Sequence, residues 1–351
     1  MPESTSHRRA PEHPPLVLAL HLEPATIHAA LVNESGHFIA LRSKNIKPVS
    51  VSAMVAAIGQ LILELSDTAE RETSEIKAMG ISVDGIVDQQ AERVTFNQQS
   101  GFAWERVPLK TMIEETLLDS GVDLRFARHA SPARAAKNEP SHPHIIVAAH
   151  RHVHVCAEMW QGAGSGLSNV VLLSFGLNHA AAGIMAHGKI ISGVGDLAGS
   201  IANLSLSKDA GVTLATEANA SALVRKTLEK WTLKIDSALN LLARTDPSQL
   251  TAATILRAAR SGDPLALEAV HEICVVIGRT AANIIALLNC EAVIVGGEFG
   301  QLLKPFISTI RQAVKESAPP AAMKQCQIVS AKLKENLELL GAAKLAWNSV
   351  T

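Results

Sequence analysis

The fold is decided by the stretch from Asp263 to Gly300, DPLALEAVHEICVVIGRTAANIIALLNCEAVIVGGEFG. Asp263 can cap a helix because its carboxylate accepts the free N–H groups of a first turn, and Pro264 follows where a missing N–H costs nothing. Apolar residues then recur at helical spacing as far as Leu288. A short apolar run, Ala292 to Val295, follows and indicates a buried strand. It ends in Gly296-Gly297. We expect a long core helix, a central strand and a glycine turn that either approaches a ligand or simply turns tightly.

Composition excludes several classes of protein. The 351 residues are enough for two domains or one bilobal unit, and the hydrophobic fraction of 47% allows sizeable cores. A net charge of −1 gives no field that would favour nucleic acid or membranes, and with no Tyr and 3% aromatic residues the surface is poorly equipped to stack bases. The four cysteines contain no CxxC pair, which fits a reducing cytoplasm. No apolar run is expected to reach the length of a membrane span.

Strand and helix patterns alternate along the chain, which predicts an α/β fold. Apolar runs separated by turns indicate a strand hairpin near Leu16–Leu41 and a second one near Val170–Ile190. We therefore expect two related lobes with a cleft between them. Residues 1–14 are expected to be a disordered leader, 15–137 an N-terminal domain and 138–335 a C-terminal domain, with a last helix at 336–351 that packs back on the N-terminal domain.

Several stretches together resemble the ROK family of sugar kinases and sugar-responsive repressors. They are Asn283–Gly297, Asn169–Asn203, the segment LLGAA at Leu339–Ala343, GISVDGIVD at Gly80–Asp88 and FNQQSGFAWERVPLK at Phe96–Lys110. The resemblance covers the chain from about Pro15 to its end. It implies two α/β domains of the actin-like ATPase (ribonuclease H-like) fold that flank a cleft, and a homodimer.

The phosphate-binding motifs implied by the resemblance are altered. The family's DxGGT corresponds to His21-Leu22-Glu23-Pro24-Ala25, so both glycines are replaced and Pro24 has no N–H to offer a phosphate. The family's second phosphate turn, GTGIG, corresponds to Gly176-Leu177-Asn178-His179-Ala180, where only the first glycine remains. The glycine pair Gly296-Gly297, where the family seats adenosine, is retained.

The family's catalytic aspartate lies in an ENDAN segment after a strand, and two alignments are possible here. Distance from the preceding helix places Ala130 at that position, and distance to the following segment places His150 there. We favour Ala130. Neither alignment supplies a carboxylate as the general base, although imidazole can act as a base near neutral pH.

The sugar-contacting GEIGH segment corresponds to Gly199-Ser200-Ile201-Ala202-Asn203, and the family's zinc-binding cysteine motif is absent. The candidate ligand-binding residues are Asp84, Gly85, Asn97, Gly176, Asn178, Ser200, Asn203, Gly296 and Gly297. If residues 151–156 are extended, His150, His152 and His154 share one face with metal-ligand spacing. A polar surface strand explains these histidines more simply, so we assign no metal. The carboxylates of Asp196 and Glu217 have no partner that the sequence defines, and we expect both to be solvated.

The resemblance thus predicts a sugar kinase-like protein whose kinase site has degenerated, with an effector-binding or regulatory role, for example in transcription regulation. The alternatives are an active, divergent kinase for hexoses or N-acetylhexosamines that uses ATP and Mg²⁺, and a dimeric scaffold without a ligand. We assign no cofactor outside the kinase alternative. A sugar-like effector is the expected partner, and direct DNA binding is not expected because only about fifteen residues precede the first strand.

Overall fold

The computed structural model describes residues 14–23, 25–46, 50–69, 76–96, 104–119, 144–209, 211–231, 237–240 and 249–350. The chain forms two compact units, one of Met1–His150 with Glu338–Thr351 and the other of Arg151–Leu337. The sequence placed the boundary after residue 137. It falls later because strand β7 (Ile145–Ala149) pairs with β4 (Ile76–Val83) and so belongs to the first unit.

The first unit is built on a five-stranded sheet of order β3-β2-β1-β4-β7. Strands β1 (Leu16–Leu22), β2 (Thr26–Asn33) and β3 (Phe38–Asn45) form the expected antiparallel opening, and β1, β4 and β7 run parallel. A separate two-stranded ribbon joins β5 (Gly85–Asp88) to β6 (Arg93–Phe96). The residues of β1 are buried along its whole length because it lies in the middle of the sheet.

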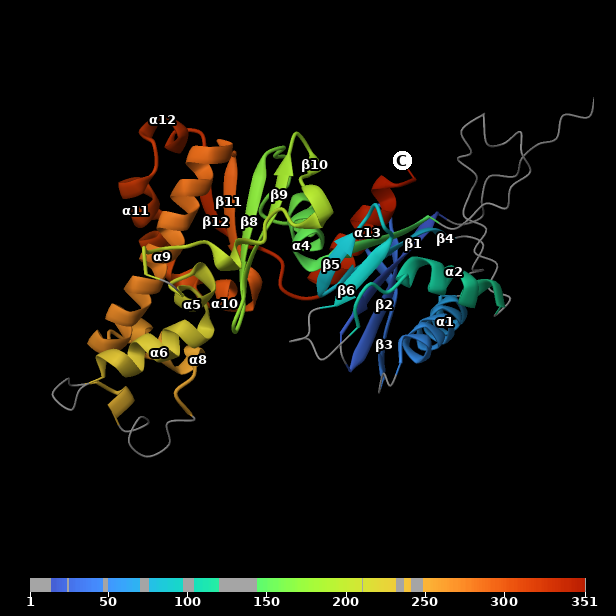
Figure 1. Cartoon of the computed structure of the whole chain (residues 1–351), viewed down its shortest axis with the longest axis horizontal. Coiled ribbons are helices and arrows are strands. Elements are labelled where there is room, and N and C mark those ends of the chain that lie inside the picture. The colour runs from blue at the N-terminus through green and yellow to red at the C-terminus, as the bar shows by residue number, and fades with distance from the viewer. Residues whose placement is uncertain are drawn as a thin grey trace, which may run out of the picture. The chain divides into compact units, whose positions relative to one another are not determined.

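Helices cover both faces of this sheet. Helix α1 (Val51–Thr68) and helix α2 (Leu109–Asp119) pack together over one face, and the last helix, α13 (Leu337–Asn348), lies on the other (Figure 1). Met79 and Ile81 belong to the core beneath α1, whereas Gly80 between them faces the Ala342 backbone of α13. This alternation is the two-residue period of a strand. The last helix therefore packs on the first unit, as the sequence suggested.

The second unit has a five-stranded sheet of order β10-β9-β8-β11-β12. Its strands are β8 (Val170–Phe175), β9 (Ala180–Ala186), β10 (Lys189–Ile190), β11 (Ala292–Gly296) and β12 (Gln327–Ser330). The pair β8–β9 is antiparallel, and β8, β11 and β12 run parallel. The second predicted hairpin, near Val170–Ile190, is thereby confirmed.

The stretch from Asp263 to Gly300 contains the core helix of this unit and the strand β11 that follows it. Asp263 caps α9 (Pro264–Leu288) by accepting the Ala266 N–H at 2.9 Å, and Asn289 ends it in the left-handed conformation. One face of the sheet packs on α9, α6 (Ala220–Lys230), α8 (Ala252–Arg260) and α11 (Ile307–Ser317). The other face carries α4 (His150–Gln161), whose backbone approaches Gly183 of β9 (Figure 1).

The apolar pattern of the sequence predicts continuous helices over Leu214–Glu229 and Leu302–Lys315, and the structure interrupts both. The expected helix Leu214–Glu229 divides into α5 (Leu214–Glu217) and α6, because the Asn219 side chain caps a new helix by accepting the Ala222 N–H. Of the expected helix Leu302–Lys315, only Leu302 belongs to α10 (Gly297–Leu302), and α11 begins at Ile307. A 3₁₀ turn at Lys304–Phe306 separates them, where Pro305 lacks the N–H that an α-helix needs. A further single turn, α12 (Pro320–Met323), precedes β12.

The expectation about membrane spans needs correction. By length and composition alone, α1 and α9 are apolar enough to cross a bilayer. Both contribute buried residues to the cores around their sheets, with Met54 and Ile58 of α1 and Ile273 and Ile277 of α9 fully enclosed. Their apolar character is that of core helices that each cover one face of a sheet.

Candidate functional site

The carboxyl ends of three parallel strands meet at one edge of the first sheet. Leu22 of β1 lies beside Val83 of β4, which lies beside Ala149 of β7. The residues that follow these strands are Glu23, Asp84 and His150. Ligands of open α/β sheets bind at this edge, beyond the carboxyl ends of the strands. The first unit therefore offers a candidate site made of polar side chains.

A cluster of three histidines and one glutamate occupies this edge. Nε2 of His21 donates to Glu23 Oε1 at 3.1 Å, and Nε2 of His28 lies 3.6 Å from Glu23 Oε2. The His21 ring stacks on the His28 ring, with centroids 5.8 Å apart. The His150 ring, which follows β7, has its centroid 4.9 Å from that of His21. We call His21, Glu23, His28 and His150 the histidine cluster.

Electrostatics in the histidine cluster favour an ionised carboxylate. The hydrogen bond from His21 lowers the pKa of Glu23, and the charges of His21 and His28 act in the same direction against partial burial. His21 is 7% exposed, and its Nδ1 is buried with no hydrogen-bond partner in the described part of the chain. The cluster can therefore offer imidazole nitrogens and a carboxylate to the hydroxyl groups of a ligand.

The sequence singled out His21, Glu23 and His150 separately, but it missed His28 and did not predict that the four residues meet. His21 and His28 are opposite each other in the β1–β2 hairpin. That register could have been anticipated from the turn between the two strands, but their approach to His150 depends on the crossover to β7. The alignment that placed His150 after a strand matches the observed junction, since β7 ends at Ala149 and α4 begins at His150. Ala130, the position we favoured, lies outside the described residues, as does Asn97.

Of the remaining candidates of the first unit, Gly85 has a structural role that needs no ligand. Asp84 is half-buried at the end of β4. At Gly85 an added Cβ would lie 2.4 Å from the Thr95 carbonyl oxygen, so close pairing with β6 requires a glycine there. The structure brings Asp84 to the same sheet edge as the histidine cluster.

The histidines of α4 are helical, not extended as the metal hypothesis required. His150 and His154 are one turn apart, whereas His152 points elsewhere and is 3% exposed. His152 Nδ1 lies 3.2 Å from Asp196 Oδ1, and Arg151 also pairs with Asp196 at 3.2 Å. Among the described residues no group of three or more metal-ligating side chains is placed to hold an ion.

Asp196 and Glu217 were expected to be solvated, and both expectations are wrong. Asp196 is 4% exposed and ties the loop after β10 to α4 through Arg151 and His152. That loop carries Ser200 and Asn203, which are both exposed. Glu217 pairs with Arg225 at 2.8 Å and with Lys226 at 2.6 Å. Asp196 is thus neutralised by residues of α4, and Glu217 by two residues of the helix that follows it, α6.

In the second unit, the turn between β8 and β9 is occupied by its own protein atoms. The Gly176 and Leu177 carbonyls accept the N–H groups of Ala220 and Ser221 at the start of α6, each at 3.1 Å. A Cβ on Gly176 would lie 2.0 Å from the His179 ring, so that imidazole lies directly against the turn. Asn178 is exposed. The helix N–H groups that could bind a phosphate are thus already hydrogen-bonded.

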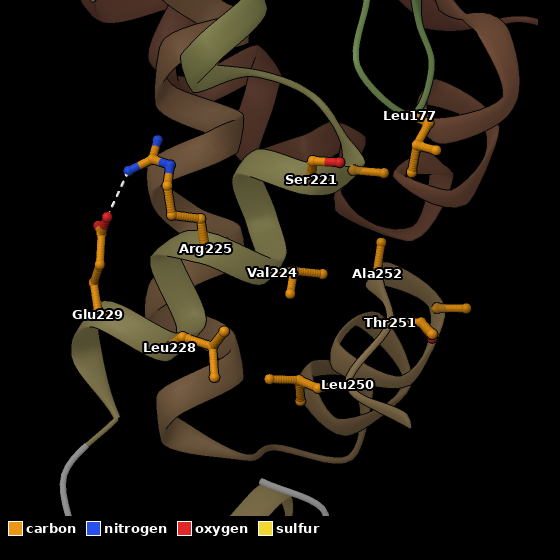
Figure 2. Close-up of a pocket in the computed structure, with 11 residues that line it drawn as sticks. Leu177, Ser221, Val224, Arg225, Leu228, Glu229, Leu250, Thr251 and Ala252 are labelled. Carbon is orange, nitrogen blue, oxygen red and sulfur yellow. Dashed lines mark hydrogen bonds and ion pairs between the residues drawn. The ribbon is translucent and has the colours of Figure 1, made fainter. Parts of the chain in front are cut away.

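An apolar pocket of about 640 Å³ opens beside this turn. Leu177, Val224 and Leu250 point toward its centre, and Arg225 pairs with Glu229 at 2.8 Å on its margin (Figure 2). Its volume is typical of a small-molecule site. The pocket is lined by Leu177, Ala220, Ser221, Val224, Arg225, Leu228, Glu229, Leu250, Thr251, Ala252 and Ala253.

The glycine pair after β11 forms a tight strand-to-helix turn. Gly297 has a φ of +78°, and an added Cβ would lie 2.5 Å from the Phe175 oxygen and 2.6 Å from Ser174 Oγ. Gly296 is the last residue of β11. Packing against the end of β8 is sufficient to require the second glycine, whether or not a ligand approaches.

Comparison with known proteins places these observations in a family. The model of the ROK family matches residues 18–137 and 144–349. The chain belongs to the ROK family. Its two-unit α/β architecture is the actin-like ATPase fold of ROK sugar kinases.

Relatives of this ROK protein include both kinases and repressors. A glucokinase of Halalkalibacterium halodurans is 25% identical over 78% of this chain and 77% of its own length. A xylose repressor of Caldicellulosiruptor bescii is 21% identical over 93% of this chain and 76% of its own length. The structure of a ROK family glucokinase from Streptomyces griseus, in complex with glucose and AMPPNP, superposes with a TM-score of 0.69 at 22% identity, covering 95% of this chain and 99% of that one.

Proposed function

We propose that this ROK protein is a non-catalytic, sugar-responsive regulatory protein. The observation that carries the proposal is the pair of imidazoles, His21 and His150, with ring centroids 4.9 Å apart. His21 corresponds to the aspartate of the family's first phosphate motif, and His150 stands at the general-base aspartate in the alignment that is the alternative to Ala130.

Phosphoryl transfer from ATP depends on charge neutralisation around the phosphates, with Mg²⁺ held by oxygen ligands. Imidazole nitrogens do not replace those ligands. The carboxylate of Glu23 would repel phosphate oxygens where the family has a glycine, and the neighbouring Pro24 has no N–H to donate. The loss of a general base alone costs roughly 10²–10⁴ in rate. Together these substitutions disfavour kinase activity.

The same side chains suit a neutral sugar. Carboxylate oxygens accept hydrogen bonds from hydroxyl groups, and imidazole nitrogens can either donate or accept them. His21 Nδ1 is buried and has no partner among the described residues. The relatives named glucokinase and xylose repressor support a hexose or pentose as the effector. We place the protein in the reducing cytoplasm and expect a homodimer, both by analogy with the family.

An active kinase for hexoses or N-acetylhexosamines is the second candidate, and one observation favours it. The apolar pocket lies at the turn after β8, and the retained Gly297 packs against the last residue of that strand. The adenosine of ATP could pack against the apolar surface of this pocket. In this case ATP and Mg²⁺ are the cofactors and His150 is the base.

A two-part experiment separates these functions. ADP release is measured with MgATP and a panel of hexoses, pentoses and N-acetylhexosamines, and binding of each sugar alone is measured by calorimetry. We expect no sugar-dependent ADP release, together with binding of at least one sugar. His150→Ala should weaken that binding about tenfold, the value of one hydrogen bond.

His144→Ala is the matched control, because His144 is exposed and lies just before β7. Its backbone carbonyl accepts a hydrogen bond from the Met79 N–H, and alanine retains that carbonyl. Sugar-dependent turnover that His150→Ala abolishes and His144→Ala preserves would establish the kinase instead. Absence of both turnover and sugar binding would leave the dimeric scaffold.

A further inference from the structure

Two cysteines meet where the parallel strands β11 and β12 begin. Gln327 lies opposite Ala292, and the Gln327 N–H donates to the Glu291 carbonyl at 2.9 Å, which extends the pairing by one residue. Cys326 therefore lies beside Glu291, one residue from Cys290. With strands about 4.8 Å apart and a rise of about 3.3 Å per residue, positions offset in this way have Cα atoms about 6 Å apart, within the range of disulfides.

Both thiols of this pair are buried, and they lie in contact with each other. Cys290 is 3% exposed and Cys326 is 7% exposed, and both are free cysteines of the core of the second unit. Their thiols share a hydrogen bond. Hydrogen bonding from Cys290 lowers the pKa of Cys326, whereas the same contact and burial raise the pKa of Cys290. Cys326 is accordingly the better nucleophile.

We propose that Cys290 and Cys326 form an intramolecular disulfide when the protein meets a peroxide. This is a reversible modification site that is independent of the sugar-binding role. It joins the end of α9 to the start of β12, so that α10 and α11 lie within a covalent loop.

The chemistry needs only hydrogen peroxide as oxidant. The Cys326 thiolate attacks one peroxide oxygen, the O–O bond breaks, hydroxide leaves and a sulfenic acid forms. The Cys290 sulfur then attacks the Cys326 sulfur, the S–O bond breaks, and water leaves with the proton of Cys290. Two thiols lose two electrons in total, and one peroxide is reduced to two molecules of water.

The test uses the full-length native protein. It is treated with hydrogen peroxide, its remaining thiols are blocked with an alkylating agent, and it is digested with trypsin without reduction. Trypsin separates the two cysteines because Arg311, Lys315 and Lys324 lie between them. We expect a peptide pair that contains Cys290 and Cys326, lighter by two hydrogens than the separate thiol peptides, and released by a reductant.

Serine variants make the result specific. Cys326→Ser should abolish the cross-link, and a variant with Cys156→Ser and Cys274→Ser should retain it. Cys274 is a suitable internal control because burial raises its pKa to about 12, so that it stays protonated and unreactive. Alkylation of Cys290 and Cys326 after peroxide to the same extent as before it, a lasting sulfenic acid at Cys326, or a cross-link to Cys156 or Cys274 would each overturn the proposal.

Discussion

At the scale of single residues, Gly297 shows how a glycine can be required by backbone packing. Its positive φ and the closeness of Phe175 both exclude a side chain. Gly188, in the turn between β9 and β10, has a similar φ of +71° but no atom within 4 Å of an added Cβ. A substitution at Gly188 would therefore meet only the strain of the left-handed backbone, whereas one at Gly297 would meet that strain and a steric clash.

We expect Gly188→Ala to lower the free energy of unfolding by about 1 kcal/mol, the cost of the left-handed backbone. Gly297→Ala should cost roughly 2–4 kcal/mol, because the clash with Phe175 adds to the same strain. Urea unfolding of both variants measures the difference. Equal losses would mean that the turn after β11 relaxes freely and that Gly297 is not held by β8.

Glu23 gives a prediction about pH. Its pKa lies below the ordinary value of 4.5, chiefly because of the hydrogen bond from His21. A carboxylate with a depressed pKa stabilises the folded state above its unfolded pKa, and that contribution is lost as the pH falls through the folded value.

The wild type should therefore lose thermal stability more steeply than Glu23→Gln as the pH falls below about 4.5. Because the Glu23 side chain is 48% exposed, solvent screening limits the effect to less than about 1 kcal/mol. Glu34→Gln, in the exposed β2–β3 turn, is the control and should follow the wild type. The melting temperature of each variant is measured between neutral and acidic pH. If it falls equally for the wild type and Glu23→Gln, the prediction is contradicted.

At the scale of elements, Asp263 joins two parts of the second unit. Its Oδ1 accepts the Ala266 N–H at the start of α9, and its Oδ2 accepts the Ala238 N–H at 2.7 Å. The sequence predicted the cap but not the second bond, because Ala238 is 25 positions away. A residue chosen for its helix signal thus also fixes a neighbouring segment.

Asp263→Ala should lower the free energy of unfolding by about 2–3 kcal/mol, since it removes a helix cap and leaves a second N–H without its acceptor. Asp263→Asn should lose less, because Oδ1 still caps α9. Urea denaturation of the two variants provides the measurement. Identical losses would show that the bond to Ala238 contributes nothing.

At the scale of the whole molecule, the chain returns to its first unit at its end. The Trp347 Nε1–H donates to the Asn33 carbonyl at 3.1 Å, and α13 passes so close to β4 that a Cβ on Gly80 would lie 1.9 Å from the Ala342 oxygen. The C-terminal residues are therefore part of a unit whose other residues come from the first 150 positions.

Gly80→Ala should push α13 away from β4 and cost the first unit about 3 kcal/mol, since the obstacle is backbone and cannot rotate aside. Hydrogen exchange followed by mass spectrometry should show faster exchange in β1 and β4 and unchanged exchange in β8 and β11. Gly300→Ala is the control, because its added Cβ has only ordinary contacts, the nearest at 3.5 Å. Faster exchange in both units would refute the assignment of α13 to the first.

The sequence by itself determined most elements and the family. Periodicity and capping are local signals, so the strand Val170–Phe175 and the helix that Asp263 caps could be located from the residues alone. The order of the motifs along the chain was sufficient to predict the ROK fold. The interruptions at Asn219 and Pro305 carried local signals too, which the longer apolar pattern obscured.

Only the tertiary structure decided which polar groups meet. His21 reaches His150 because β7 joins the sheet beside β4, and Asp196 is neutralised by Arg151 from an earlier helix. The sequence treated Asp196 as solvated and spread the histidines of α4 along a strand. The sequence gives the chemistry of each side chain, but its partners depend on strand order and helix packing. These bring together residues as far apart as His21 and His150.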